Sequence, residues 1–279
     1  MGASARLLLA VGLLLGAASP AASAATPSTT RVVVVEDRGV VAPSQTAGFS
    51  ERCPARAPHP VGATFGPTDD APLAGQLMLT ASFPLRRAGW RVVVKNITPL
   101  PQPFFAGAVC VGSPAGLAYP EMTDVAAPGM DDGFGVRCPR RAPQGIGGFF
   151  SPQDAAGLGQ LVNDSSFRTD GGWDIGVRNL APAPHGYFAG AVCAGRELHT
   201  ALVTQTRKVA PGARIETQLR CPRRAPQPIA SVHAAADAAA GGQIIATDAF
   251  RTGARTWNTG VRNVSTASQM AGVGVICVR

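Results

Sequence analysis

Apolar and polar residues alternate along several short stretches of this chain. After Trp90, the β-branched residues Val92 and Val94 occupy every second position, and the same spacing of β-branched residues follows Trp173 and Trp257. Charged or small residues hold most of the positions between them. A period of two is the pattern of a half-buried β-strand, so these stretches are predicted to be strands.

The alternating stretches belong to a unit that occurs three times. Each copy opens with the motif Cys-Pro-x-Arg-Ala-Pro, continues through the tryptophan strand to an asparagine, and closes with a second cysteine. An Ala-Pro turn signature stands ten residues before each opening cysteine. The residues in these positions are Pro43, Pro128 and Pro211 in the turns, and Asn96, Asn179 and Asn263 at the ends of the strands. A period of this kind indicates a repeat protein.

The remaining pattern favours strands over helices in every copy. The runs 31–35 and 104–109 are continuously apolar or small and predict more deeply buried strands. Proline and glycine interrupt the chain about every ten residues, which argues against long helices. The stretch 231–240 has the alanine content of a helix, but its equivalents contain Pro67 and Pro152, so we expect a loop there.

The predicted fold is all-β. We expect three tandem antiparallel β-sandwich-like modules at 31–111, 112–196 and 197–279, each with about six short strands. A single pseudo-threefold β-prism, in which the three copies close around an axis, is the alternative architecture. No low-complexity linker separates the copies, so the modules are expected to be in contact.

The chain contains six cysteines, and all of them lie within the repeats. Six cysteines allow 15 pairings, and spacing alone does not choose among them. Equivalent cysteines in three copies are expected to pair in the same way, which predicts Cys53–Cys110, Cys138–Cys193 and Cys221–Cys277. Each bond would stabilise a module too small to have a large core.

The first residues of the chain have the features of a Sec-type signal peptide. Arg6 supplies a positive charge, 7–18 is apolar, and Ala22-Ser23-Ala24 fits the small-residue pattern of a cleavage site. The apolar run is shorter than the ~20 residues that span a bilayer. We expect cleavage of residues 1–24 near Ala24, secretion, and no membrane-spanning segment.

Arginine carries nearly all of the positive charge, and the formal net charge of the chain is +8. Arg56, Arg141 and Arg224 each stand between Cys-Pro and Ala-Pro, where proline on both sides predicts stiff, exposed loops. A rigid guanidinium binds carboxylate or phosphate through two hydrogen bonds. These three residues are the candidate anion-binding site, with an anionic cell-wall polymer or glycan as the expected partner and no nucleic acid.

The order of Cys-Pro, Gly-Trp, Asn and Val-Cys in each copy resembles a class of secreted actinobacterial proteins of unknown function. The resemblance covers about 31–279 and implies repeated β modules without implying a ligand. Only Gly145-Ile146-Gly147-Gly148 keeps the glycine-rich stretch that usually follows Cys-Pro in that class. A triplicated β unit is also similar to the three-faced prism of vitelline membrane outer layer proteins.

No motif for catalysis, cofactor binding or a metal site is evident in the sequence. His233 and Asp237 have the i, i+4 spacing of a helical metal pair, but the equivalents of His233 are Phe65 and Phe150, so aromatic packing is the favoured reading. The repeated aspartates Asp69, Asp154 and Asp237 are interpreted as turn residues. The tryptophans are interpreted as core residues in preference to sugar-stacking platforms.

Two classes of function remain open. The favoured one is a non-enzymatic extracellular or cell-envelope-associated protein, structural or ligand-binding. The alternative is a secreted hydrolase with a site between modules. Repetition favours the first, because a catalytic group is expected once, whereas nearly every notable residue here occurs three times.

Overall fold

The computed structural model describes residues 30–68, 76–85, 88–112, 116–236 and 243–279. Within these ranges the chain forms eighteen β-strands and no helix, which confirms the predicted all-β class. None of it therefore has the long apolar helix that crossing a bilayer would require. The predicted signal peptide lies outside the described residues.

Six strands fall in each repeat, in the same order. The first repeat holds β1 (Val32–Val41), β2 (Thr46–Arg52), β3 (His59–Pro67), β4 (Leu77–Leu85), β5 (Gly89–Asn96) and β6 (Gln102–Val111). The second holds β7 (Glu121–Ala126), β8 (Asp131–Arg137), β9 (Gln144–Pro152), β10 (Leu161–Thr169), β11 (Gly172–Asn179) and β12 (His185–Ala194). The third holds β13 (Thr200–Val209), β14 (Arg214–Arg220), β15 (Gln227–Ala235), β16 (Ile244–Gly253), β17 (Thr256–Asn263) and β18 (Gln269–Val278). The tryptophan strands are β5, β11 and β17.

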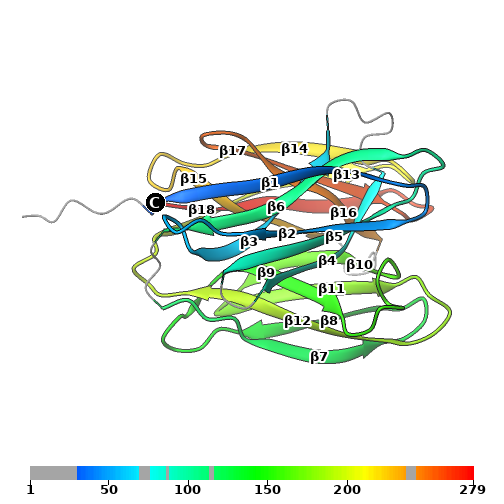
Figure 1. Ribbon diagram of the computed structural model, residues 1–279, viewed down its shortest axis with the longest axis horizontal. Helices are drawn as coiled ribbons and strands as arrows, with labels where there is room; N and C mark the ends of the chain where they lie inside the picture. Colours follow the sequence, from blue (N-terminus) through cyan, green and yellow to red (C-terminus); the bar gives the residue numbers. More distant parts are fainter. Residues whose placement is uncertain (1–29, 69–75, 86–87, 113–115, 237–242) are drawn as a thin grey trace, which may run out of the picture.

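The strands of each repeat are divided between two antiparallel half-sheets that pack face to face. In the first repeat, β1-β6-β3 packs on β2-β5-β4, and the other repeats follow the same plan. Each six-stranded sheet then joins a half-sheet of one repeat to a half-sheet of another: β1-β6-β3-β16-β17-β14, β13-β18-β15-β10-β11-β8, and β2-β5-β4-β9-β12-β7. The three repeats therefore close into a ring, as in the pseudo-threefold arrangement. Figure 1 shows the strands running along the length of the molecule, with the second repeat at the bottom of the view.

Three equivalent contacts close this ring. Phe65 on β3 pairs with Ala249 on β16, Phe150 on β9 with Ser82 on β4, and His233 on β15 with Ser166 on β10. A second ring of equivalent side chains, Met78, Val162 and Ile245, forms a small buried cluster of its own. The side chains of this small cluster therefore come one from each repeat, as expected for packing around a pseudo-threefold axis.

All three tryptophan side chains are fully buried, which confirms their interpretation as core residues. The Nε1 atoms of Trp90 and Trp173 donate hydrogen bonds of 2.8 Å to the hydroxyls of Ser82 and Ser166. The equivalent of these serines in the third repeat is Ala249, and Trp257 Nε1 has no partner among the described residues. The core of the third repeat is therefore less completely hydrogen-bonded.

The predicted disulfides, Cys53–Cys110, Cys138–Cys193 and Cys221–Cys277, are all present. Their Cα–Cα distances of 5.6–5.8 Å are ordinary for disulfides. Each bond fastens a Cys-Pro turn to the last strand of its own repeat. The repeat therefore predicted the disulfide pairing correctly, although six cysteines alone allow 15 pairings.

The asparagine that ends each tryptophan strand is bonded to nearby backbone, as expected. Asn179 Nδ2 donates to the carbonyl oxygens of Ala126 at 2.9 Å and Ala183 at 2.8 Å, and its Oδ1 accepts from the Ala181 amide. Asn96 and Asn263 make the equivalent contacts. Each asparagine thus ties the end of its strand to two neighbouring loops.

The Ala-Pro signatures also form turns as predicted. The Gln45 amide donates to the Ala42 carbonyl, and the third turn residue is Ser44, with φ of 58°. Gly129 and Gly212 occupy that position in the other repeats, with φ of 69° and 65°. Proline followed by a residue of positive φ is the pattern of a type II turn, and serine pays a conformational cost there that glycine avoids.

Two local predictions are wrong. The run 31–35, expected to be deeply buried, has valines that are only half-buried, because β1 is an edge strand of its sheet. Residues 231–235, expected to be part of a loop, belong to strand β15. The equivalents Pro67 and Pro152 are the last residues of β3 and β9, so they mark the end of a strand and leave the preceding residues free to pair. The end of the stretch, 237–240, lies outside the described residues.

Candidate anion-binding site

The three Cys-Pro turns lie at the same end of the molecule. In the first sheet, β3 begins directly after the turn of the first repeat, and its first residue, His59, is level with Val32 and Val111. Strand β16 runs antiparallel to β3, so the hairpin between β16 and β17 lies at this end as well. Thr256, at the start of β17, pairs with Arg220, the residue just before the Cys-Pro turn of the third repeat. That turn therefore lies at the same end as the turn of the first repeat. The other two sheets repeat this order, which brings all three turns together at one end. Figure 1 shows the C-terminus at this end, beside the start of β1.

Each turn holds its arginine in the same position. The amides of Ala57, Ala142 and Ala225 donate to the carbonyls of the prolines three residues earlier, at 2.8, 2.8 and 3.1 Å. Arg56, Arg141 and Arg224 are the third residues of these turns, and all three are exposed. Among the described residues none of them forms an ion pair or a side-chain hydrogen bond. These guanidinium groups are therefore free to bind a ligand.

Other cations gather at this end, because strands of all three sheets begin or finish there. They are Arg31, Arg52, Arg137, Arg140, Arg196, Arg220, Arg223, Arg255 and Arg279. The acidic residues in the same segments are fewer: Glu51, Glu121, Asp170 and Glu197. The end that carries the Cys-Pro turns therefore has an excess of positive charge, and we call it the arginine-bearing end.

A cleft of about 420 Å³ opens at this end between the second and third repeats. Its lining includes Arg224 from the turn of the third repeat, Arg196 and His199 from the segment between β12 and β13, and Arg279 after β18. Gln144 and Thr200 complete its polar lining. The structure thus places one predicted residue, Arg224, in a cleft, whereas Arg56 and Arg141 do not line it.

The candidate site residues predicted from the sequence did not include Arg196, His199 and Arg279. The repeat directed attention to residues that occur three times, and these three occur once, in a connecting segment or after the last strand. Their only signal was a basic side chain beside a cysteine-bearing strand, which is common in an arginine-rich chain. These three side chains come together around one cleft only because the repeats close into a ring.

The candidate metal residues do not form a site. His233 is 2 % exposed and takes the packing position of Phe65 and Phe150, as predicted. Asp154 accepts a 2.6 Å hydrogen bond from the Gly157 amide, which lowers the pKa of its carboxyl and confirms its interpretation as a turn residue. Asp69 and Asp237 lie outside the described residues. Within the described ranges no three His, Cys, Asp or Glu side chains are grouped to hold a metal.

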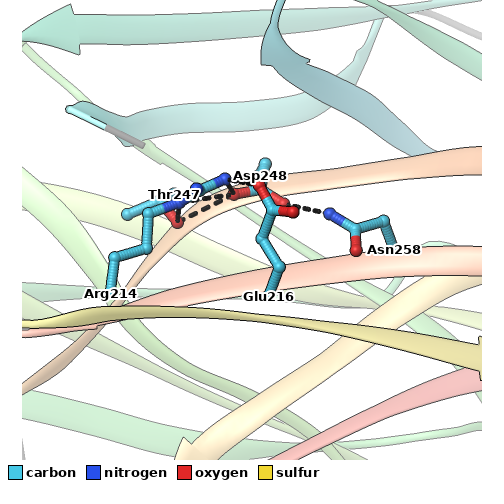
Figure 2. Close-up of polar contacts among 5 residues, drawn as sticks. All are labelled: Arg214, Glu216, Thr247, Asp248 and Asn258. Atoms are coloured by element: carbon cyan, nitrogen blue, oxygen red, sulfur yellow. Dashed lines mark hydrogen bonds and ion pairs between the residues drawn. The ribbon is translucent and has the colours of Figure 1, made fainter. Parts of the chain in front are cut away.

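A buried polar network occurs on the third repeat, away from the arginine-bearing end. Figure 2 shows the carboxylate of Asp248, on β16, between Arg214 on β14 and Asn258 on β17. Arg214 Nη2 lies 2.7 Å from Asp248 Oδ2 and also pairs with Glu216, while Asn258 Nδ2 donates to Asp248 Oδ1 at 2.7 Å. Burial raises the pKa of Asp248, and the adjacent guanidinium opposes that rise. Since every oxygen of Asp248 has a partner, the network is explained as structural.

Comparison of the chain with models of known protein families finds no match, and comparison with curated proteins finds none either. The geometry and charge of the arginine-bearing end are therefore the features that bear on function.

Proposed function

We propose that this protein is a secreted, non-enzymatic protein of the extracellular space or cell envelope that binds an anionic polymer, a cell-wall polymer or a glycan, through its arginine-bearing end. The observation that carries the proposal is the position of three equivalent turns at one end, each with an unpaired, exposed arginine. The turn backbone is fixed by proline and by an internal hydrogen bond, so little additional entropy is lost on binding.

Repetition suits a polymeric ligand. A chain with regularly spaced negative charges can engage several turns at once, and each contact raises the effective concentration for the next. Because the arginines are exposed, salt screens their attraction for the ligand, and binding is expected to weaken as ionic strength rises. Repetition also supports a non-enzymatic role, since the residues of the turns are of one type and offer no distinct acid, base and nucleophile.

Cysteine chemistry supports the proposed compartment. Three disulfides indicate an oxidising environment of the kind found outside the cytoplasm. We propose that residues 1–24 direct secretion and are removed near Ala24. The intact mass of the protein recovered from the medium tests this step: retention of 7–18 would contradict it.

Simultaneous replacement of Arg56, Arg141 and Arg224 by alanine is expected to weaken binding to an anionic polymer about tenfold at low salt. Exposed ion pairs typically contribute about 0.5 kcal/mol each, and three of them give about 1.5 kcal/mol, which corresponds to a tenfold loss. Retention on immobilised heparin and on purified wall polymer, at low and physiological salt, measures the effect. The difference between variant and wild type is expected to shrink as salt rises.

A matched control separates position from net charge. Replacement of Arg38, Arg207 and Lys208 by alanine removes the same three charges from exposed positions on β1 and β13, away from the turns. This control is expected to retain most of the affinity. Equal retention of both triple variants and the wild type would leave the turn arginines as solubilising residues and would refute the proposal.

A further inference from the structure

We propose that the cleft between the second and third repeats binds a single tetrahedral oxyanion, a phosphate or sulfate group, through Arg196, Arg224 and Arg279. The inference rests on the proposed function in its choice of an anionic ligand, and it adds a defined subsite and a chemical class. The proposed subsite occurs once, between the second and third repeats, whereas the Cys-Pro turns occur in all three repeats.

Three separate segments bring cations to this cleft. Arg196 lies in the connection between β12 and β13, Arg224 in the turn before β15, and Arg279 directly after β18. None of the three guanidinium groups forms an ion pair or a side-chain hydrogen bond with a described residue. Like charges held together without an internal partner repel one another, and a bound anion relieves that repulsion.

The connection that carries Arg196 is held in place. Gln144 Nε2 donates to the carbonyl oxygens of Gly195 at 2.8 Å and Leu198 at 3.2 Å. Its Oε1 accepts from the Thr200 hydroxyl at 3.1 Å, and that hydroxyl accepts from Arg168 at 3.0 Å. Gln144 and Thr200 are thus already partnered, so the three guanidinium groups and the exposed His199 imidazole are the donors that remain for a ligand.

The acid nearest to these arginines in the sequence does not neutralise them. Glu197 is exposed and folds onto the backbone at Gly195, where a Cβ would lie 2.2 Å from Glu197 Oε1. It forms no ion pair with a described arginine. Its charge is nevertheless close to the cleft and is expected to lower the affinity for an anion.

The number of guanidinium groups selects the class of ligand. One arginine satisfies both oxygens of a carboxylate with two parallel hydrogen bonds. A tetrahedral oxyanion presents three or four oxygens, which three guanidinium groups can approach from different sides. The cleft is therefore better suited to phosphate or sulfate than to carboxylate, and its volume leaves room for the sugar or alcohol to which the group is esterified.

The test is titration of the full secreted protein with inorganic phosphate, with sulfate and with acetate at constant ionic strength, followed by calorimetry or by NMR of labelled backbone amides. We expect saturable binding of phosphate or sulfate and none of acetate, with amide shifts at 195–200 and 223–226. Comparison of the two tetrahedral anions distinguishes a phosphate ester from a sulfate ester as the natural group.

Four single variants, one of them a control, sharpen the result. Arg196→Ala and Arg279→Ala are each expected to weaken oxyanion binding about tenfold, the loss of one charge-assisted contact. Glu197→Gln is expected to strengthen it severalfold. Arg140→Ala removes an exposed arginine from the same end but not from the cleft lining, and is expected to leave the affinity unchanged.

Failure of this inference is distinguishable from failure of the proposed function. Absence of saturable oxyanion binding, equal binding of acetate, or equal losses in Arg140→Ala and Arg196→Ala would overturn the cleft as a site. The proposed function would still stand if heparin retention depended on Arg56 and Arg141, which do not line the cleft. Loss of polymer binding in the cleft variants alone would instead make this cleft the whole site and refute the role of the repeated turns.

Discussion

Replacement of Trp173 by alanine is expected to lower the free energy of unfolding by about 3–5 kcal/mol, the cost of truncating a fully buried aromatic side chain. Trp173 is 0 % exposed, and its Nε1 donates to Ser166. Its indole lies over Gly148 on β9, where a Cβ would be 2.3 Å from Nε1. The variant therefore loses packing between the two half-sheets of the second repeat as well as a hydrogen bond.

Because the three repeats form a closed ring, the loss of stability in the second repeat is expected to affect the whole protein. Strand β10, which holds Ser166, also pairs with β15 of the third repeat, so the damage is expected to appear as one cooperative transition at lower denaturant concentration. Leu202→Ala, at a side chain that is 43 % exposed, serves as the control and is expected to change stability by less than about 0.5 kcal/mol. Unchanged unfolding of Trp173→Ala would show that the indole does not hold the half-sheets together.

Acidification is expected to destabilise the protein through His233. This imidazole lines a cavity of about 40 Å³ near the axis, together with Phe65, Phe150 and Ser166, and its ring nitrogens have no hydrogen-bond partner among the described residues. The Asn163 backbone lies close to the ring without meeting normal hydrogen-bond geometry. Burial lowers the pKa of His233 from 6.5 to about 4.

The direction of the effect follows from the pKa. Since the pKa in the folded state is the lower one, the unfolded chain takes up a proton first as pH falls below 6.5. The stability contributed by neutral His233 is complete above that pH and is lost between about 6.5 and 4, a loss of about 3 kcal/mol. Denaturant unfolding of the wild type and of His233→Phe at a series of pH values measures it.

The comparison with His233→Phe isolates this residue from other titrating groups. Burial raises the pKa of Asp164 to about 7, which gives a contribution of the opposite sign, because that carboxyl favours folding more as pH falls. Phenylalanine is the residue of the other two repeats at this position, so the variant is expected to fold, to be more stable, and to gain most over the wild type at pH 4. A constant difference between the two proteins across pH would contradict the assignment.

The interior of each repeat was predictable from its sequence. Alternation with a period of two identified the tryptophan strands, and the burial of all three tryptophans follows from the β-branched residues in phase with them. Threefold repetition selected one disulfide pairing from 15, and equivalence with Phe65 and Phe150 identified His233 as a packing residue. These features depend on contacts within a repeat or on comparison between repeats.

The relation between repeats was harder to predict. Periodicity shows which face of a strand is buried, but it does not show which strand lies beside it, so the joining of β3 to β16 had no local signal. The cleft depends on that closure, because Arg196 and Arg279 approach Arg224 only when the connection and the last strand pass the turn of the third repeat. The threefold repetition of the sequence allowed a pseudo-threefold prism to be considered as an alternative fold. The cleft could not be predicted in the same way, because it depends on contacts between repeats.

Hydrogen–deuterium exchange of the wild-type protein with and without anionic polymer tests the central claim most directly, because it locates the binding surface. The type II turns at 42–45, 127–130 and 210–213 lie at the opposite ends of the strands and provide an internal control. We predict slower exchange at 55–57, 140–142 and 223–225, with further protection at 195–200, and no change at the control turns. Protection confined to the control turns, or spread evenly over both ends, would contradict binding at the arginine-bearing end.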